Sequence, residues 1–232
     1  MTGAVVPAGW PQAVLFDLDG TLIDSAPDLH ASVNLLLVRH SLGPLTLAEV
    51  ISMIGNGVKK LVERAFAACG RPLDQADLER ELQAMLGIYG DHLTVLTVLM
   101  PGAHESVQRL HAAGVWLGVV TNKPQRPTEA ILDHFGLSPY LGAVVGGDTG
   151  VEKKPAPDMI FAALERLGMT PDQAVMVGDS PADVASARAA GVAVIAVRGG
   201  YTTVPVDALG ADLIIESLEH LTAALDRLSR TS

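Results

Sequence analysis

The amino-acid sequence predicts an α/β fold, a Rossmann-like, doubly wound parallel sheet with a small α-helical domain inserted into it. Short apolar runs that end abruptly recur along the chain, and stretches of helical periodicity fill the intervals between them. Residues 25–97 break this alternation, because they show helical periodicity and no convincing strand. The 232 residues suit a core domain, residues 1–24 and 98–232, that carries residues 25–97 as a smaller domain.

The predicted strands are apolar throughout, as expected for a parallel sheet that is buried on both faces. Three of these runs are followed at once by Asp17, Thr121 and Gly178. Strands are expected at residues 13–16, 115–120, 143–145, 174–177, 192–197 and 213–215. Helices of the core are expected at residues 103–113, 127–135, 158–167, 181–190 and 218–228.

Three helices are expected within the inserted segment. The first contains the apolar positions Leu29 and Leu37. The second begins at Thr46, where Glu49 three residues later predicts a capping box. The third follows the glycines of residues 55–57 and places its apolar side chains on one face.

The composition is that of a globular protein, with 49% apolar and 18% charged residues. A formal net charge of −10 with scattered basic residues predicts neither a nucleic-acid nor a membrane partner. No apolar run approaches the ~18 residues of a membrane span, and the first residues lack a secretory signal. Cys69 is the only cysteine, so we expect a cytoplasmic protein without disulfides. A monomer and a homodimer remain open.

Four polar segments stand at the ends of predicted strands or close to them in the sequence. Ligands of open parallel sheets bind beyond the carboxyl ends of the strands, so these segments are expected to converge at one edge of the sheet. Together they supply acids, a hydroxyl group and a lysine. The four segments are residues 17–21, 121–123, 154–155 and 178–183.

The acids of these segments predict a metal site. Carboxylates that lie close together repel one another unless a cation lies among them, and ligand sets made only of oxygen suit a hard ion such as Mg²⁺. The same ion would attract a phosphate dianion, whose remaining oxygens Lys154 and the Thr121 hydroxyl would bind. The sequence therefore predicts chemistry on a phosphate ester.

The four segments together resemble the signature motifs of the haloacid dehalogenase (HAD) superfamily, in the order that this superfamily uses. The Asp-x-Asp-Gly-Thr-Leu segment that begins at Asp17 is the most specific of them. This resemblance implies that Asp17 is a nucleophile that forms an aspartyl-phosphate and that Asp19 is the general acid and base. It also implies a helical cap at residues 25–97.

The resemblance implies a ligand set as well. Phosphate binding is expected from Gly20, Thr121, Asn122 and Lys154. The expected magnesium ligands are the carboxylates of Asp17 and Asp179 and the backbone carbonyl of Asp19, with Asp183 in support.

Several single residues have a second interpretation. Asp183 follows Ser180 and Pro181 as in an ordinary capped helix start, so capping and a metal-linked role both stay open. Asp24 and Asp28 are expected to be partners of a helix dipole rather than catalytic groups.

Further side chains near the motifs are expected to lie outside the chemistry. Lys123 and Lys153 are expected to be solvated, and Cys69 is expected to be inert at the end of a helix.

In the cap, Gly55 and Asn56 precede a helix start, where free N–H groups favour an anion such as a substrate carboxylate. A plain turn is the other interpretation. With the segment 146–148 and the Lys-Lys-Pro-x-Pro-Asp run at 153–158, this loop resembles bacterial phosphoglycolate phosphatases. The expected function is thus hydrolysis of small phosphorylated metabolites, with 2-phosphoglycolate favoured. A phosphosugar phosphatase or a phosphomutase is the alternative, and a non-catalytic sensor of phosphorylated metabolites is the least favoured.

Overall fold

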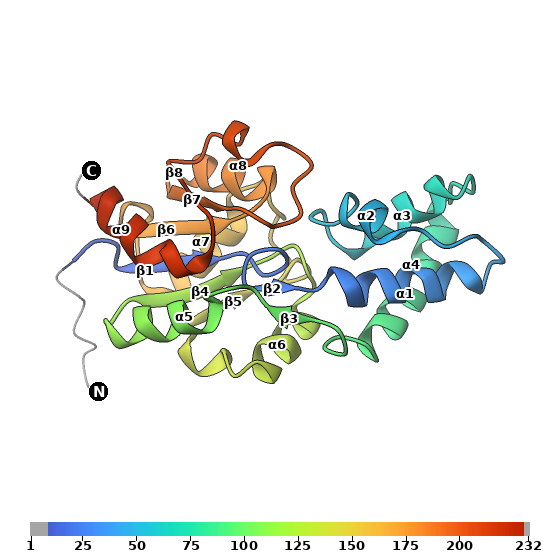
Figure 1. Cartoon of the computed structure of the whole chain (residues 1–232), viewed down its shortest axis with the longest axis horizontal. Helices are drawn as coiled ribbons and strands as arrows, with labels where there is room; N and C mark the ends of the chain where they lie inside the picture. Colours follow the sequence, from blue (N-terminus) through green and yellow to red (C-terminus); the bar gives the residue numbers. More distant parts are fainter. Residues whose placement is uncertain (1–8, 230–232) are drawn as a thin grey trace.

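The computed structural model describes residues 9–229. A six-stranded parallel sheet with helices on both faces forms one part of the molecule, and the helices α1–α4 form a second part beyond one end of the sheet (Figure 1). The strand order is β5-β4-β1-β6-β7-β8, so the first strand lies in the interior of the sheet. This architecture confirms the predicted α/β class.

The strands of the large sheet are short and mostly buried, because helices cover both faces. All neighbouring pairs are parallel, and Phe16 at the end of β1 aligns with Val119 in β4 and Val177 in β6. The strands are β1 (Ala13–Phe16), β4 (Trp116–Val120), β5 (Ala143–Val145), β6 (Ala174–Gly178), β7 (Ala193–Val197) and β8 (Leu213–Ile215).

Helices from opposite faces of the sheet contribute to two hydrophobic clusters. Helices α5, α6 and α9 pack with one set of strand side chains, and α7 and α8 pack with the other. The core helices are α5 (Ala103–Ala112), α6 (Gln125–His134), α7 (Asp158–Leu167), α8 (Pro181–Ala190) and α9 (Leu221–Ser229). Short 3₁₀ helices occupy Ser138–Tyr140, Pro171–Gln173, Val206–Ala208 and Leu218–His220.

The inserted helices pack around a hydrophobic cluster of their own, in which Phe66, Met85 and Tyr89 are almost completely buried. The capping box predicted at Thr46 and Glu49 is present at the start of α2. The helices are α1 (Ala26–Val38), α2 (Leu47–Ile51), α3 (Val58–Ala68) and α4 (Gln75–Gly90).

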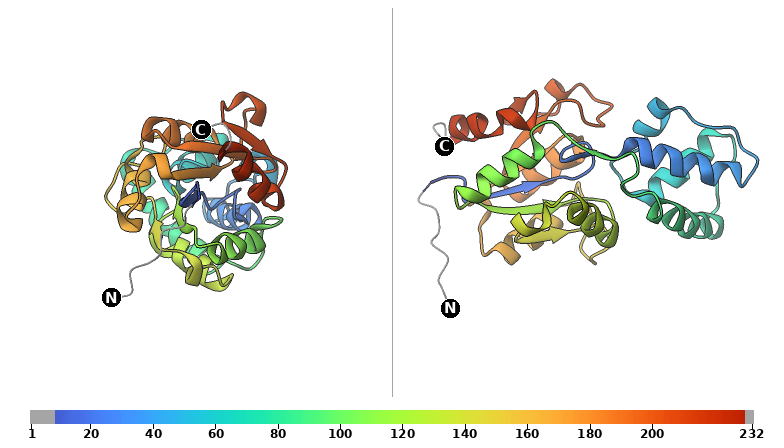
Figure 2. Two further views of the ribbon diagram at one scale, coloured as in Figure 1. Left: turned by 90° about the vertical axis from the view of Figure 1, so that its left-hand side faces the viewer. Right: turned by 60° about the horizontal axis from the view of Figure 1, so that its bottom comes forward.

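Two linkers join the inserted helices to the sheet (Figure 2), and they pair as the short antiparallel strands β2 (Ile23–Asp24) and β3 (Val98–Leu99). Asp28, in the first turn of α1, accepts hydrogen bonds from the backbone N–H groups of Leu96 and Thr97 and from the Thr97 hydroxyl. Asp28 is buried, and these hydrogen bonds fasten the start of α1 to the returning linker.

Most predicted elements are confirmed to within a residue or two. The helix predicted at 127–135 begins earlier, at Gln125, because Pro124 rather than Pro127 stands at its N-cap. The helix predicted at 218–228 is divided into a 3₁₀ turn and α9. Helix α4 had no counterpart among the expected helices. None of the helices within residues 9–229 is long and apolar enough to cross a membrane.

The buried cluster of the inserted helices predicts a stability effect at Phe66. Phe66→Ala removes a side chain with no exposed surface, which should lower the free energy of unfolding by about 3–5 kcal/mol. Phe161→Ala is the matched control, because that side chain is 45% exposed and should cost far less. Urea titration followed by circular dichroism measures both. Equal effects of the two substitutions would contradict the assignment of this core.

Candidate active site

The first site segment follows β1. The backbone N–H of Asp17 still bonds to Val177, which continues the sheet, and the chain then turns at Leu18, whose N–H donates to Asp17 Oδ1 at 2.7 Å. Gly20 has φ +84°, and a Cβ there would lie 2.6 Å from Asp179 Oδ2. Glycine is therefore required at this turn, because only glycine combines that backbone angle with the close approach.

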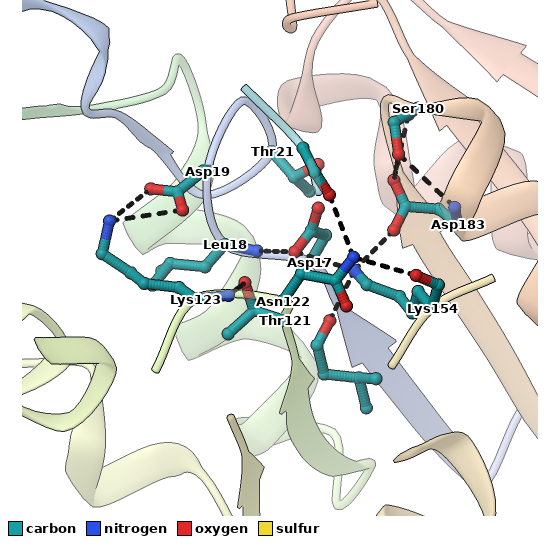
Figure 3. Close-up of polar contacts among 12 residues, drawn as sticks. Asp17, Leu18, Asp19, Thr21, Thr121, Asn122, Lys123, Lys154, Ser180 and Asp183 are labelled. Carbon is teal, nitrogen blue, oxygen red and sulfur yellow. Dashed lines mark hydrogen bonds and ion pairs between the residues drawn. The ribbon is translucent and has the colours of Figure 1, made fainter. Parts of the chain in front are cut away.

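Three carboxyl groups meet beside this turn, those of Asp17, Asp179 and Asp183. Figure 3 shows Asp17 and Asp183 on either side of Lys154. One oxygen from each of the three carboxyl groups lies within 4.8 Å of the others, and all three residues are buried. The ammonium of Lys154 lies among them, 2.9 Å from Asp17 Oδ1 and 2.6 Å from Asp183 Oδ1. It also donates to the Val120 carbonyl at 2.8 Å.

The pKa values shift because these charges are buried together. Burial raises the pKa of Asp17, Asp183 raises it further, and Lys154 lowers it, with a result of about 7. Burial, then Asp183 and Asp17, hold the pKa of Asp179 well above its usual range. Burial alone would lower the pKa of Lys154, but the carboxylates of Asp17 and Asp183 raise it above its ordinary value. One ammonium is thus too little positive charge for three ionised carboxyl groups.

The donor chemistry of this cluster fits a hard divalent cation. All candidate ligand atoms are oxygens, and an added positive charge would favour the ionised forms of Asp17 and Asp179, whose pKa values are raised. Asp179 is also fixed by the Thr21 hydroxyl at 2.9 Å and by the Tyr201 N–H at 2.7 Å. The side chains of Asp17, Asp179 and Asp183 could therefore hold Mg²⁺.

Asp183 caps a helix and also forms an ion pair with Lys154. Its Oδ2 accepts hydrogen bonds from the N–H and the hydroxyl of Ser180, so it completes a capping box at the start of α8. Its Oδ1 faces Lys154. The same carboxylate therefore shapes the helix start and belongs to the charge cluster.

The Asp19 carboxylate lies apart from this cluster (Figure 3). It accepts a hydrogen bond from the Ser25 hydroxyl at 2.5 Å, and the Lys123 ammonium donates to its two oxygens at 2.9 and 3.2 Å. The Lys123 ammonium also donates to the Tyr89 hydroxyl at 2.7 Å. Asp19 thus has a fixed orientation away from the acids that could bind a cation.

The expectation that Lys123 is solvated is wrong. The residue is only 4% exposed, because the inserted helices cover the loop that follows β4 and bring Tyr89 against it. Burial lowers the pKa of Lys123, but the carboxylate of Asp19 and then Tyr89 raise it above the usual value. Lys153, in contrast, is exposed as expected. In the sequence, the one indication that Lys123 belongs to the site is its position directly after Thr121 and Asn122.

The loop after β4 also contacts the inserted segment through Asn122. The Asn122 side-chain amide donates to the carbonyls of Gly55 at 2.9 Å and Lys154 at 3.0 Å, while its Oδ1 is buried without a hydrogen-bond partner. The Thr121 hydroxyl accepts from the Lys123 N–H at 3.3 Å. Asn122 thus contacts the backbone of Lys154, and Thr121 and Asn122 both line the same cavity as Asp17.

A cavity of about 30 Å³ lies between the sheet edge and the inserted helices. It is lined by Asp17, Asp19, residues 121–123, Leu29, Ile54, Gly55, Gly57, Val58 and Leu61. A cleft of about 230 Å³ shares the wall at Ile54 and Gly55 and is bordered by Asn56 and Arg64. Gly55 therefore faces the cavity, whereas the Asn56 side chain lies in the cleft and accepts a hydrogen bond from Arg64 at 2.8 Å.

The remaining acids near the first motif are structural. Asp24 accepts from the Ala26 N–H at the start of α1 at 3.3 Å and from the Tyr201 hydroxyl at 2.7 Å. Asp28 stands in the first turn, as a dipole partner would, but its hydrogen bonds go to the returning linker. Cys69 caps the end of α3 and contacts the carbonyl of Gly43.

Comparison with known proteins agrees with this geometry. Residues 14–197 match the family model of haloacid dehalogenase-like hydrolases. The chain belongs to this family. It is 44% identical over 215 residues to a phosphoglycolate phosphatase of Rhodospirillum rubrum, covering 91% of this chain and 89% of that one. It is 42% identical to a phosphoglycolate phosphatase of Caulobacter vibrioides over 204 residues, covering 88% and 86% of the two chains.

A solved structure shares the whole architecture. The crystal structure of a predicted phosphoglycolate phosphatase from Haemophilus somnus superposes with a TM-score of 0.87 at 31% identity and covers 92% of this chain and 97% of that one. This family member is accordingly a phosphoric monoester hydrolase, as the sequence predicted.

The raised pKa of Asp17 predicts a pH-dependent stability in metal-free protein. The pKa is about 7 in the folded state against 3.8 as the ordinary value, so the folded state holds this proton more tightly. The resulting stability is complete below about pH 3.8 and is lost as the pH rises through about 7. Asp17→Asn cannot ionise and should escape this loss.

Urea titrations in EDTA at pH 5 and pH 8 measure the effect. Between pH 5 and pH 8 the free energy of unfolding of wild type should fall by at least about 1 kcal/mol more than that of Asp17→Asn, since one pKa unit corresponds to about 1.4 kcal/mol. Asp226→Asn, at an exposed position of α9, is the matched control and should follow wild type. If wild type instead became more stable relative to Asp17→Asn as the pH rises from 5 to 8, the predicted direction of the pH dependence would be wrong.

Proposed function

We propose that this family member is a Mg²⁺-dependent phosphatase that cleaves small phosphate monoesters through an aspartyl-phosphate on Asp17. The observation that carries the proposal is the arrangement around Lys154. This ammonium contacts Asp17 and Asp183, while Asp19 is held separately at the same cavity. The site therefore offers a nucleophile, a cation site and a second carboxyl group in distinct places.

Asp17 is suited to attack phosphorus through Oδ2. The Leu18 N–H and Lys154 both bond to Oδ1, so they orient the carboxylate and leave Oδ2 for the reaction. Oδ2 forms the bond to phosphorus as the bond to the leaving oxygen breaks, which gives an aspartyl-phosphate and an alkoxide. Water then attacks the same phosphorus and releases inorganic phosphate and free Asp17.

Asp19 is suited to move the proton in both steps. Its carboxyl group would protonate the leaving alkoxide and later remove a proton from the attacking water. Ser25 and Lys123 hold it by hydrogen bonds, so it cannot collapse onto the acids around Lys154. This separation keeps the acid and base distinct from the nucleophile.

We assign the cation to the carboxylates of Asp17, Asp179 and Asp183 and to the backbone carbonyl of Asp19. When bound, Mg²⁺ would supply positive charge that stabilises the phosphoryl oxygens in the transition state. Gly20, Thr121, Asn122 and Lys154 are proposed to bind the phosphoryl oxygens. Lys154 already lies 2.9 Å from Asp17, within reach of a group bonded to that carboxylate.

We further propose that residues 25–97 act as a cap that opens to admit substrate. The cavity is lined on one side by Asp17 and Asp19 at the sheet edge and on the other by side chains of the inserted helices, so a substrate at Asp17 would lie between the two parts. Closure would exclude bulk water and restrict the substrate to small metabolites. Leu29, Ile54 and Val58 of the inserted segment supply apolar walls on the side of the cavity that faces Asp17 and Asp19.

The proposed substrate is 2-phosphoglycolate. The named activity of the relatives supports it, as does the start of α3 at the cavity wall, where Gly57 provides no side-chain cap for the first N–H groups. These groups could bind the carboxylate of the substrate. In this proposal Gly55 shapes the wall beside that position, and Asn56 keeps the loop in place through Arg64.

A release assay for inorganic phosphate tests the proposal. Wild type with Mg²⁺ should hydrolyse 2-phosphoglycolate in preference to sugar phosphates, nucleotides and pyrophosphate. EDTA or Asp17→Asn should abolish turnover, because each removes a component of the first step. Asp226→Asn is the matched control and should keep full activity, since it lies on the exposed side of α9.

The other outcomes separate the alternatives. Preferred turnover of a phosphosugar would keep the phosphatase mechanism and reject the substrate. Transfer of the phosphoryl group back to a sugar would indicate a phosphomutase. Binding of phosphorylated metabolites with no turnover of any of them would contradict the proposed function and favour a sensor.

A further inference from the structure

The Lys123 ammonium is saturated by protein groups. It donates to Asp19 Oδ1 at 2.9 Å, to Asp19 Oδ2 at 3.2 Å and to the Tyr89 hydroxyl at 2.7 Å. A lysine ammonium has three N–H donors, and these contacts account for all of them. In this arrangement Lys123 fixes the orientation of the Asp19 carboxylate and has no N–H left to donate to a phosphoryl oxygen.

The position of Lys123 depends on Tyr89, a side chain of the inserted helices. Tyr89 belongs to α4 of the inserted helices, whereas Asp19 and Lys123 follow β1 and β4 of the sheet. Tyr89 is 1% exposed and Lys123 is 4% exposed, so no bulk water can replace the hydroxyl. Loss of one partner from a buried ammonium is costly, and the side chain would be driven to another position.

A second contact between the two parts reaches the neighbouring residue. The Asn122 amide donates to the Gly55 carbonyl of the loop before α3 at 2.9 Å. The inserted helices therefore engage consecutive residues of one loop, Asn122 and Lys123, and that loop lines the cavity. The position of the Asp19 carboxylate therefore depends, through this loop, on contact between the inserted helices and the sheet edge.

We propose that Tyr89 and Lys123 are positioning residues that place the Asp19 carboxylate for proton transfer only when the inserted helices are seated on the sheet edge. The proposal rests on the function proposed above, because it takes Asp19 as the general acid. Its consequence is that the leaving group is protonated efficiently in the closed arrangement. Phosphoryl transfer to Asp17 itself does not need Tyr89.

The dependence on the leaving group tests this assignment. An alkoxide leaves with difficulty unless it is protonated, whereas p-nitrophenolate leaves readily without a proton. The quantity to compare is kcat/KM, which reports the steps up to departure of the leaving group. The two substrates are 2-phosphoglycolate, or the best alkyl phosphate of the release assay, and p-nitrophenyl phosphate.

Tyr89→Phe keeps the ring and removes only the hydroxyl. We expect it to lower kcat/KM for the alkyl phosphate by about 10–100-fold, which is less than the roughly 10²–10⁴-fold of general acid catalysis because Asp19 itself remains. It should change kcat/KM for p-nitrophenyl phosphate by less than about threefold. Lys123→Met should show the same split. Tyr140→Phe is the matched control, because its hydroxyl accepts a hydrogen bond from Gln108 at an exposed position away from Asp19.

Equal losses on both substrates would overturn the proposal, because they would indicate a direct contact with the phosphoryl group or a general loss of structure. Unchanged activity on both would also overturn it. Circular dichroism verifies folding, and Tyr89→Phe alone decides the matter if Lys123→Met does not fold. Asp19→Asn distinguishes failure of the positioning role from failure of the proposed function. If Asp19→Asn lowers kcat/KM equally for both substrates, the role of Asp19 as general acid is wrong and the proposed function fails. If Asp19→Asn affects mainly the alkyl phosphate but Tyr89→Phe does not, only the positioning role is rejected.

Discussion

The structure of the site depends on the buried ion pairs of Lys154 with Asp17 and Asp183. A lysine with 1% of its side chain exposed is stable only because two carboxylates and the Val120 carbonyl surround its ammonium. Asp17 follows β1, Val120 is the last residue of β4, and Asp183 lies in the first turn of the helix after β6, so these contacts hold together the edge at which the strands end. Burial and then the neighbouring Asp183 raise the pKa of Asp17 to about 7 in spite of Lys154. The carboxyl groups of Asp17, Asp179 and Asp183 are close enough together to hold a cation.

The ion pair of Asp19 with Lys123 lies near the cluster around Lys154 and has a different proposed role. Asp19 is held by Ser25 and Lys123, away from the cluster around Lys154. Two carboxyl groups that are two residues apart in sequence thus have different partners, which suits one for attack and the other for proton transfer. The contact of Lys123 with Tyr89 brings the inserted helices into this arrangement.

Much of this organisation could be predicted from the sequence, because strand ends of a parallel sheet converge. Asp17, Thr121 and Asp179 were expected at one edge for that reason, and the structure brings them there. The burial of Lys123 could not be predicted, since it depends on Tyr89, which is 34 residues away in the chain and belongs to another part of the fold. Helix α4 was missed because its apolar side chains are interrupted by charged ones and its burial arises only from packing against α1 and α3.

The central claim is the covalent intermediate on Asp17, and trapping it is the most direct test. Asp19→Asn should slow hydrolysis of the intermediate, and p-nitrophenyl phosphate is the substrate because its leaving group departs without a proton. The variant is mixed with this substrate and Mg²⁺, quenched in acid within a turnover and analysed by peptide mass spectrometry. The account predicts one added phosphoryl group on the peptide that contains Asp17, and none after prior treatment with EDTA. A quenched enzyme that releases product yet carries no phosphoryl group, or carries it on another residue, would contradict the account.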